Sequence, residues 1–197
     1  MKIENKAQKK THYIKLFEGG TNPNLQVKDF NRDKVQDIHV SFTNKSYQKE
    51  NVYTVKNNKV TRLNMSTTIK SKNKDVANYS FQIPERWKNN FAIQTLEGNK
   101  AAKEDTYAQL ITTFYFKNGK TTDEVLLSIT TYKKADWNKL VKDGGPLPEV
   151  IKQTPKYVYV YQVPQSNPFD LKTSNGRIFE KMTMSFEEIE ASFTLNK

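Results

Sequence analysis

The sequence of 197 residues contains no cysteine, which excludes disulfide bonds, thiol catalysis and metal sites with cysteine ligands. No run of about 18 consecutive apolar residues occurs, so no segment is expected to cross a membrane as a helix. Glycine is scarce, with 7 residues, and no phosphate-binding loop, dinucleotide fingerprint or Gly-x-Ser-x-Gly motif is present. These absences remove the most recognisable signatures of nucleotide-binding and hydrolytic enzymes.

What is present is a polar, basic and aromatic chain. Aromatic residues make up 12% of the sequence, a share that argues against disorder. The net charge of +11 is unevenly distributed, because residues 1–78 carry +9 and residues 79–197 carry +2. This contrast supports a boundary near residue 75. The basic first part would attract polyanions over a distance, and the alternative interpretation is a lysine-rich surface that keeps the protein soluble.

The first part of the chain predicts a basic all-β unit over residues 1–70. It contains short apolar or alternating segments, separated by turn residues, and no helical period. Asn57–Asn58 separates two of these segments and is typical of a tight hairpin turn. Residues 71–78 are polar and without a sustained period, which indicates a linker.

Residues 79–197 predict an α+β domain in which helices pack on an antiparallel sheet. Asn118–Gly119 lies between the two strongest strand segments, 110–116 and 125–132, and predicts that they pair as a hairpin. The spacing of apolar residues predicts one helix over 135–141. It predicts another over 186–195, where Phe186, Ile189 and Phe193 would form one stripe.

The start of that last helix carries its own signal. Ser185 is a good N-cap residue, and Glu188 follows three positions later. This pair predicts a capping box.

An acidic loop in the basic first part is the candidate functional site. In DFNRDKVQD, oxygen-bearing side chains occupy positions 1, 3, 5 and 9, and position 7 would contribute a backbone carbonyl. Calcium takes six to eight oxygen ligands, and a divalent cation would relieve the repulsion among three carboxylates. The predicted Ca²⁺ ligands are Asp29, Asn31, Asp33, the carbonyl of Val35, and Asp37. The alternative is a polar turn whose side chains accept backbone hydrogen bonds.

This loop resembles the calcium loop of FG-GAP and VCBS repeats, in which an aliphatic residue follows the last ligand as Ile38 does here. The resemblance covers about 30 residues and implies a calcium site. The sequence departs from the family pattern at Lys34, where the family has glycine. That position usually requires a positive φ, which costs a non-glycine residue about 1 kcal/mol. A weakened calcium affinity is therefore expected, and a single copy excludes a propeller.

Other candidate chemistry is weaker. The histidines, His12 and His39, follow no metal-ligand spacing, and we expect His39 to face solvent. Carboxylates at 85, 104 and 105 lie in polar segments and are expected to be solvated and not catalytic. Tyr157, Tyr159 and Tyr161 alternate along one strand and share a face. We expect that face to be covered as core, with an exposed stacking platform as the alternative.

The second part resembles small extracytoplasmic lipoprotein domains of Gram-positive bacteria, through FQIPERW, LLSITTYKKADWNKL and KYVYVYQVPQSNPFD. The Phe-x-Ile-Pro-x-x-Trp opening is similar to that of PsbP/Mog1-like folds. The resemblance covers residues 79–195 and its motifs are packing motifs. It implies a fold and a location, and almost no chemistry.

Taken together, these features predict a non-enzymatic extracytoplasmic accessory or interaction protein, at the cell surface or secreted, with no catalytic residue. The expected partner is a protein or an anionic cell-wall polymer, in preference to nucleic acid. Contact with a membrane is expected only through a lipid anchor that this sequence does not contain. The alternative function is a polyanion-binding module that uses the basic first part.

Overall fold

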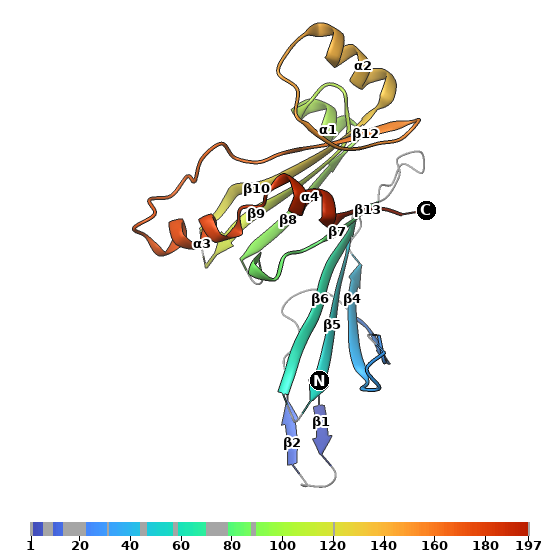
Figure 1. The fold of residues 1–197 in the computed structure, drawn as a ribbon, viewed down its shortest axis with the longest axis vertical. Helices are drawn as coiled ribbons and strands as arrows, with labels where there is room; N and C mark the ends of the chain where they lie inside the picture. Colours follow the sequence, from blue (N-terminus) through green and yellow to red (C-terminus); the bar gives the residue numbers. More distant parts are fainter. Residues whose placement is uncertain are drawn as a thin grey trace. The chain divides into compact units, whose positions relative to one another are not determined.

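The computed structural model describes residues 2–5, 10–13, 23–30, 32–43, 47–56, 59–69, 79–87, 90–119 and 121–196. Contacts divide the chain into two units, Met1–Thr68 and Ile69–Lys197. The predicted linker at 71–78 lies outside the described residues. The described chain is predominantly β, in antiparallel sheets, with a few helices in the second unit (Figure 1).

The described part of the first unit consists of strands. They are β1 (Lys2–Asn5), β2 (Lys10–Tyr13), β3 (Asn24–Lys28), β4 (Asp37–Thr43), β5 (Tyr47–Lys56) and β6 (Lys59–Ile69). Strands β1 and β2 pair antiparallel, and β3, β4, β5 and β6 are neighbours in that order within a second sheet. The turn predicted at Asn57–Asn58 lies outside the described residues.

Strand β4 supplies most of the core of the first unit. Its alternating residues Ile38, Val40 and Phe42 are buried together with Tyr53 of β5. The alternation places these side chains on one face of the strand, since successive side chains of a strand point to opposite faces. Asp37, the first residue of β4, is also fully buried, which brings the end of the acidic loop into the edge of this core.

The second unit contains both helices and strands. They are β7 (Tyr79–Gln82), η1 (Glu85–Trp87), β8 (Phe91–Glu97), α1 (Asn99–Glu104), β9 (Ala108–Asn118), β10 (Thr121–Lys133), α2 (Lys134–Asp143), β11 (Glu149–Gln153), β12 (Tyr157–Gln162), α3 (Ser174–Met182), α4 (Phe186–Ser192) and β13 (Phe193–Leu195). Five strands form an antiparallel sheet in the order β11-β12-β10-β9-β8, and β13 pairs with β7.

The predicted hairpin is present at the centre of this sheet. Strands β9 and β10 pair antiparallel, and Thr121 lies opposite Asn118 across the turn. Gly119 has a φ of 61°, a left-handed conformation that glycine adopts without steric cost. In Figure 1, α3 lies near this turn, whereas α1 and α2 lie at the opposite end of the sheet.

One face of the five-stranded sheet, called here the aromatic face, is covered by the segments at the two ends of the unit. Phe114 of β9 contacts Phe81 of β7 and Trp87 of η1, with ring centroids 5.1 and 5.6 Å apart. Farther along β9, Phe116 contacts Phe179 of α3. Burial of these large rings is the main stabilising contribution that the sequence offers, since each removes an extensive apolar area from water.

The opposite face is covered only at one end. Ala101 of α1 and Trp137 of α2 pack with Tyr132, Val158 and Val160 in a second buried cluster. Helix α2 ends at Gly144, which has a φ of 71° and forms a left-handed C-cap. The predicted helix at 135–141 is therefore present, over Lys134–Asp143.

The last predicted helix is present but shorter than expected. Ser185 and Glu188 form the predicted capping box, and Ile189 is fully buried. The helix ends at Ser192, and Phe193 begins β13, where it pairs with Phe81. The prediction that 193–195 continue the helix is wrong, because the ladder with β7 supplies those residues with backbone hydrogen bonds that a frayed helix end would lack.

Two helices were not predicted. Helix α1 is only six residues long, so it offers too short a pattern to detect. Asn175–Gly176 has the composition of a turn, yet it lies in α3, which Thr173 caps by accepting a hydrogen bond from the Gly176 amide. Gly176 is buried inside the first turn of this helix because its missing side chain allows the backbone of Asp170 to approach.

Candidate functional site

The acidic loop connects β3 to β4 and is held by side-chain acceptors. Asp29 Oδ1 accepts a hydrogen bond from the amide of Asp33 at 3.1 Å, and Oδ2 accepts one from the amide of Lys34 at 2.8 Å. Asp33 Oδ1 accepts a third from the amide of Val35 at 2.9 Å. Alternate carboxylates thus curl the loop, as such residues do in turns and in cation-binding loops alike.

The backbone of the loop is strained at two positions. Arg32 and Lys34 have φ angles of 60° and 66°. Positive φ is uncommon for residues with long side chains, and glycine would adopt it without cost. Lys34 therefore has the conformation that the resemblance implied for this position, although the residue is not glycine.

Asp37 is the most unusual member of the loop. Its side chain is fully buried, and Oδ2 accepts a hydrogen bond from the amide of Phe30 at 3.1 Å. The other carboxylate oxygen, Oδ1, is buried and has no hydrogen-bond partner. A buried carboxylate oxygen without a partner is costly, because nothing replaces the water that it loses. The described structure shows nothing that compensates this oxygen.

Lys56 of β5 is the cation that the structure places against the loop. Its Nζ lies 2.7 Å from Asp33 Oδ2, in an ion pair that is half-exposed. The hydrogen bond and the charge of Asp33, with a smaller contribution from Asp37, raise the pKa of Lys56 above its ordinary value. Lys56 therefore neutralises part of the negative charge that calcium would neutralise.

The structure brings Asp29, Asp33 and Asp37 to one loop but does not gather them into a finished coordination shell. Among the described residues, no three His, Cys, Asp or Glu side chains are close enough together to hold a metal ion. Asn31 lies outside the described residues, and Val35 is half-buried. Each engaged carboxylate oxygen still has a second lone pair, so the hydrogen bonds of the loop do not consume its capacity for a cation.

The histidine and carboxylate candidates have structural surroundings. His39 lies opposite the buried face of Ile38 and Val40, as expected, but it is only partly exposed: it contacts the ring of Phe30 edge-on at 5.3 Å and lies 3.9 Å from Glu50. Asp105 accepts hydrogen bonds from the hydroxyl of Tyr132 and the amide of Tyr107. Burial, aided by Asp105, raises the pKa of Tyr132. Asp105 thus anchors the turn after α1.

The tyrosines of β12 share one face, as predicted, and most of that face is core. Tyr157 and Tyr159 are buried, whereas Tyr161 is half-exposed and stacks on Phe186 with ring centroids 5.9 Å apart. Burial raises the pKa of the Tyr159 hydroxyl to about 12. An exposed platform of three tyrosines is therefore excluded.

Sequence reasoning missed a hollow on the partly covered face of the five-stranded sheet. It has a volume of about 930 Å³ and lies on β9, β10 and β12. Pro146 to Glu149 form one wall, after α2, and residues 162–165 form another, after β12. The sequence signal for the hollow was weak. Polar residues alternate with the buried residues of these strands, and the same alternation is typical of an ordinary solvated sheet face.

The strand register shows how the floor of the hollow arises. Thr113 pairs with Ser128, Ser128 pairs with Gln162, and Gln94 pairs with Thr113, so four uncharged polar residues form one row across four strands. The neighbouring row toward α1 and α2 contains Leu96, Ile111, Thr130, Val160 and Val150 and is mostly apolar. Two neighbouring rows of the same sheet face therefore differ: one belongs to the buried cluster under α1 and α2, and the next forms the floor of the hollow.

Comparison with known proteins adds no relative. No protein-family model, curated protein or solved structure matches the chain. No helix in the part of the chain that the structure describes is both long enough and apolar enough to cross a bilayer.

Proposed function

We propose that the chain is a non-enzymatic accessory protein that acts outside the cytoplasm of a Gram-positive bacterium, and that the loop at 29–37 binds Ca²⁺. The observation that carries the calcium site is the buried Oδ1 of Asp37, which has no partner and belongs to a loop with two further carboxylates. The ligands would be Asp29, Asn31, Asp33, the Val35 carbonyl and Asp37. Water would complete the shell.

The physical case for the cation is a balance of charge. Three carboxylates within nine residues repel one another, and Lys56 compensates only one of them directly. Calcium would bring two positive charges and would give Asp37 Oδ1 the partner that it lacks. A single site with Lys34 in the strained position is expected to be weak, with a dissociation constant of about 10⁻⁴–10⁻³ M, as in extracellular modules.

The location and the finer fold remain part of the proposal. The resemblance of residues 79–195 to lipoprotein domains supports an extracytoplasmic setting, and a weak calcium site would be filled there and not in the cytosol. A PsbP/Mog1-like fold is consistent with an antiparallel sheet whose aromatic face packs under α3, η1 and β7. A non-enzymatic role is supported by the structural surroundings of Asp105 and His39.

The test of the calcium site is a pair of melting curves, in EDTA and in millimolar CaCl₂ at equal ionic strength. Binding to the native state alone would stabilise the protein by about 1.4 kcal/mol at a concentration of ten times Kd. Both tryptophans, at 87 and 137, lie in the second unit, so unfolding of the first unit should be followed by circular dichroism. Calcium should also shift the amide resonances of residues 29–38.

The variant Asp37→Asn keeps the shape of the side chain and removes its charge, and it should abolish the calcium response. Asp143→Asn, at an exposed position of α2, is the matched control and should leave the response intact. Equal melting temperatures of the wild type with and without calcium, together with unshifted amide resonances, would make the segment an ordinary polar turn.

The alternative function, a polyanion-binding module, has one observation in its favour. Residues 1–78 carry 16 lysine or arginine residues against 7 acidic ones. Contacts with phosphate release counterions, so this function requires retention on heparin or DNA at low salt that falls steeply as salt is raised. Absence of retention at low salt would remove this alternative.

A further inference from the structure

The hollow on the five-stranded sheet differs in composition from the rest of the protein. Charged residues make up 27% of the chain, which predicts three or four among the thirteen residues that line the hollow. Only Glu149 is charged, and no lysine or arginine is present among them. An ordinary solvated sheet face in so basic a chain would carry lysines. The hollow therefore has a lining without cations, which does not suit a polyanion.

The floor of the hollow offers only side-chain groups to a ligand. Strands β9, β10 and β12 each have a paired strand on both sides. Their backbone N–H and C=O groups are hydrogen-bonded to the neighbouring strands, so a peptide cannot bind here as an added strand. The groups that face the hollow are the hydroxyls of Thr113 and Ser128 and the amide of Gln162. Each of these can both donate and accept hydrogen bonds.

A purely apolar ligand does not fit this floor either. The hydroxyls of Thr113 and Ser128 lie 3.4 Å apart and can bond to each other, but an apolar ligand would still take water from the amide of Gln162, at a cost of about 1–3 kcal/mol. The ligand must therefore present many neutral groups that also donate and accept. The hydroxyls of a sugar meet this requirement.

Aromatic and rigid surfaces complete the site. Tyr115 lines the hollow, and its hydroxyl donates a 2.9 Å hydrogen bond to Gln94 Oε1, which fixes the orientation of the ring. Pro146, Pro148 and Pro164 occur in the walls, where their fixed φ angles limit the freedom of the loops. A wall that is already ordered loses little entropy when a ligand binds. The apolar faces of a sugar ring can rest against such surfaces.

We propose that this hollow binds a neutral oligosaccharide through Tyr115 and the row Thr113–Ser128–Gln162. The proposal goes beyond the proposed function by adding a second binding site, and it does not depend on the calcium loop. Glu149 is the one carboxyl group among the lining residues, whereas hydrolysis of a glycosidic bond ordinarily uses two flanking carboxyl groups. Binding without cleavage is expected.

The experiment uses the full chain in EDTA, with cellohexaose, maltohexaose, xylohexaose and chitohexaose as probes at millimolar concentrations. Saturation-transfer NMR detects contact with the sugar, and calorimetry measures affinity. At least one of the probes should bind. Tyr115→Ala should weaken that binding about tenfold, since it removes the aromatic surface. Tyr115→Phe keeps the ring and should weaken it less.

The matched control is a pair of glutamine variants on the same sheet. Gln162 lies in the hollow and Gln153 lies on β11 outside it, and both are exposed. Gln162→Ala should weaken binding several-fold, whereas Gln153→Ala should leave it unchanged. Circular dichroism melting of each variant shows that it is folded, so that a loss of binding can be assigned to the site.

Three outcomes would overturn the inference: no binding of any probe by the wild type, binding that survives both Tyr115→Ala and Gln162→Ala, or stronger binding of a hexaproline peptide at the same residues. Failure of the calcium experiment would leave the inference intact. Chromatography of the sugars after incubation shows whether the protein cleaves them. Cleavage would contradict the non-enzymatic role, but it would leave the location of the binding site unchanged.

Discussion

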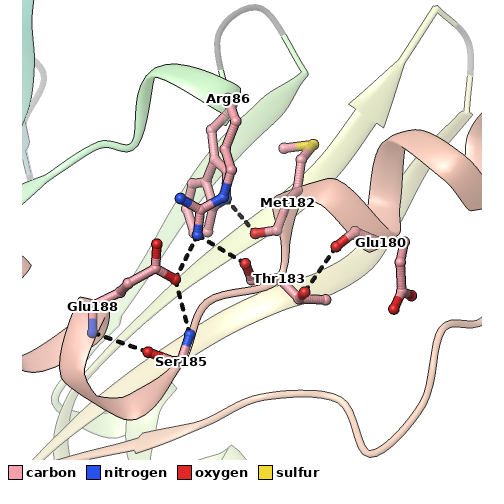
Figure 2. Close-up of polar contacts among 7 residues, drawn as sticks. Arg86, Glu180, Met182, Thr183, Ser185 and Glu188 are labelled. Atoms are coloured by element: carbon pink, nitrogen blue, oxygen red, sulfur yellow. Dashed lines mark hydrogen bonds and ion pairs between the residues drawn. The ribbon is translucent and has the colours of Figure 1, made fainter.

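Arg86 and Glu188 lie 102 positions apart in the chain and meet in an ion pair of 2.7 Å (Figure 2). The Nη2 atom of Arg86 also donates to the carbonyl of Thr183, and Glu188 Oε2 also accepts from the amide of Ser185. One carboxylate thus closes the capping box of α4 and joins that helix to η1. The pair of Arg86 and this carboxylate links the beginning of the second unit to its end.

The first prediction concerns pH. The hydrogen bond from Arg86, followed by the one from the Ser185 amide, holds the pKa of Glu188 below its ordinary value of 4.5. Its contribution to stability is therefore complete above pH 4.5 and is lost as the pH falls through the lowered pKa. Glu188→Gln removes the charge that pairs with Arg86 and should reduce the free energy of unfolding at neutral pH. The reduction should be only about 0.5–1.5 kcal/mol, because solvent screens a partly exposed pair.

The same variant should flatten the loss of stability between neutral and acidic pH. Glu190→Gln, at an exposed position on the same helix, is the control and should preserve that loss. Urea unfolding at a series of pH values measures both. An unchanged pH profile in Glu188→Gln would show that the pair contributes nothing to acid sensitivity.

A second prediction concerns Trp87. Its Nε1 donates a 2.5 Å hydrogen bond to the carbonyl of Met182, and its side chain is fully buried. Trp87→Phe should destabilise the protein by about 2–4 kcal/mol, because it leaves a cavity and an acceptor without its donor. Trp137→Phe also removes volume from a buried site and should cost less. Circular dichroism measures the unfolding of both variants. Equal losses of stability would mean that the hydrogen bond of Trp87 contributes nothing measurable.

Gly176 supports a third prediction, in which the usual sign is reversed. Replacing glycine by alanine inside a helix normally stabilises it by about 0.5–1 kcal/mol. Here an added Cβ would lie 2.1 Å from the carbonyl oxygen of Asp170, which is backbone and cannot rotate away. Gly176→Ala should therefore lower the free energy of unfolding by at least about 2 kcal/mol. Ser174→Ala, exposed at the start of the helix, should have little effect.

Lys34 provides a test of the loop register. Lys34→Gly relieves the positive φ of 66°, which costs a lysine about 1 kcal/mol, and should tighten calcium binding. Lys34→Gln removes the charge and keeps the strain, so it isolates the backbone contribution. A weaker site in the glycine variant than in the glutamine variant would mean that the assigned ligand positions are wrong.

Lys56 should compete with calcium for Asp33. Lys56→Met keeps the length of the side chain and removes the charge that lies 2.7 Å from Asp33 Oδ2. Calcium affinity should rise by about three- to tenfold at low salt and by less at high salt, since the repulsion is partly screened. Calorimetric titration at two salt concentrations measures the change. Lys59→Met, exposed at the start of β6, controls for net charge.

Local signals were sufficient where one short pattern determines one element. The turn at Gly119 produced the β9–β10 hairpin, and Ser185 with Glu188 started α4. Both depend on interactions within a few residues, which the sequence displays directly. The end of α4 was predicted wrongly, because Phe193 follows the helical spacing but pairs instead with Phe81 in the β13–β7 ladder. Phe81 lies more than a hundred positions away in the chain.

The candidate sites divide in the same way. The acidic loop was visible in the sequence because its three carboxylates fall within nine residues. The burial of Asp37 was not visible, since it depends on how β4 enters the core. The hollow was invisible because Thr113, Ser128 and Gln162 come from three strands and become neighbours only through register.

The pairing of β13 with β7 has a consequence for the order in which the protein folds. Phe193 lies opposite Phe81, so the second unit closes only when its last strand meets its first. Contacts between such distant positions form slowly, because a long loop must be ordered before they can stabilise anything. During synthesis, Phe81, Trp87 and Phe114 emerge long before residue 193. A chain still being synthesised therefore exposes part of its aromatic face until residues 193–195 are available to pair with β7, and in that interval the exposed rings favour aggregation.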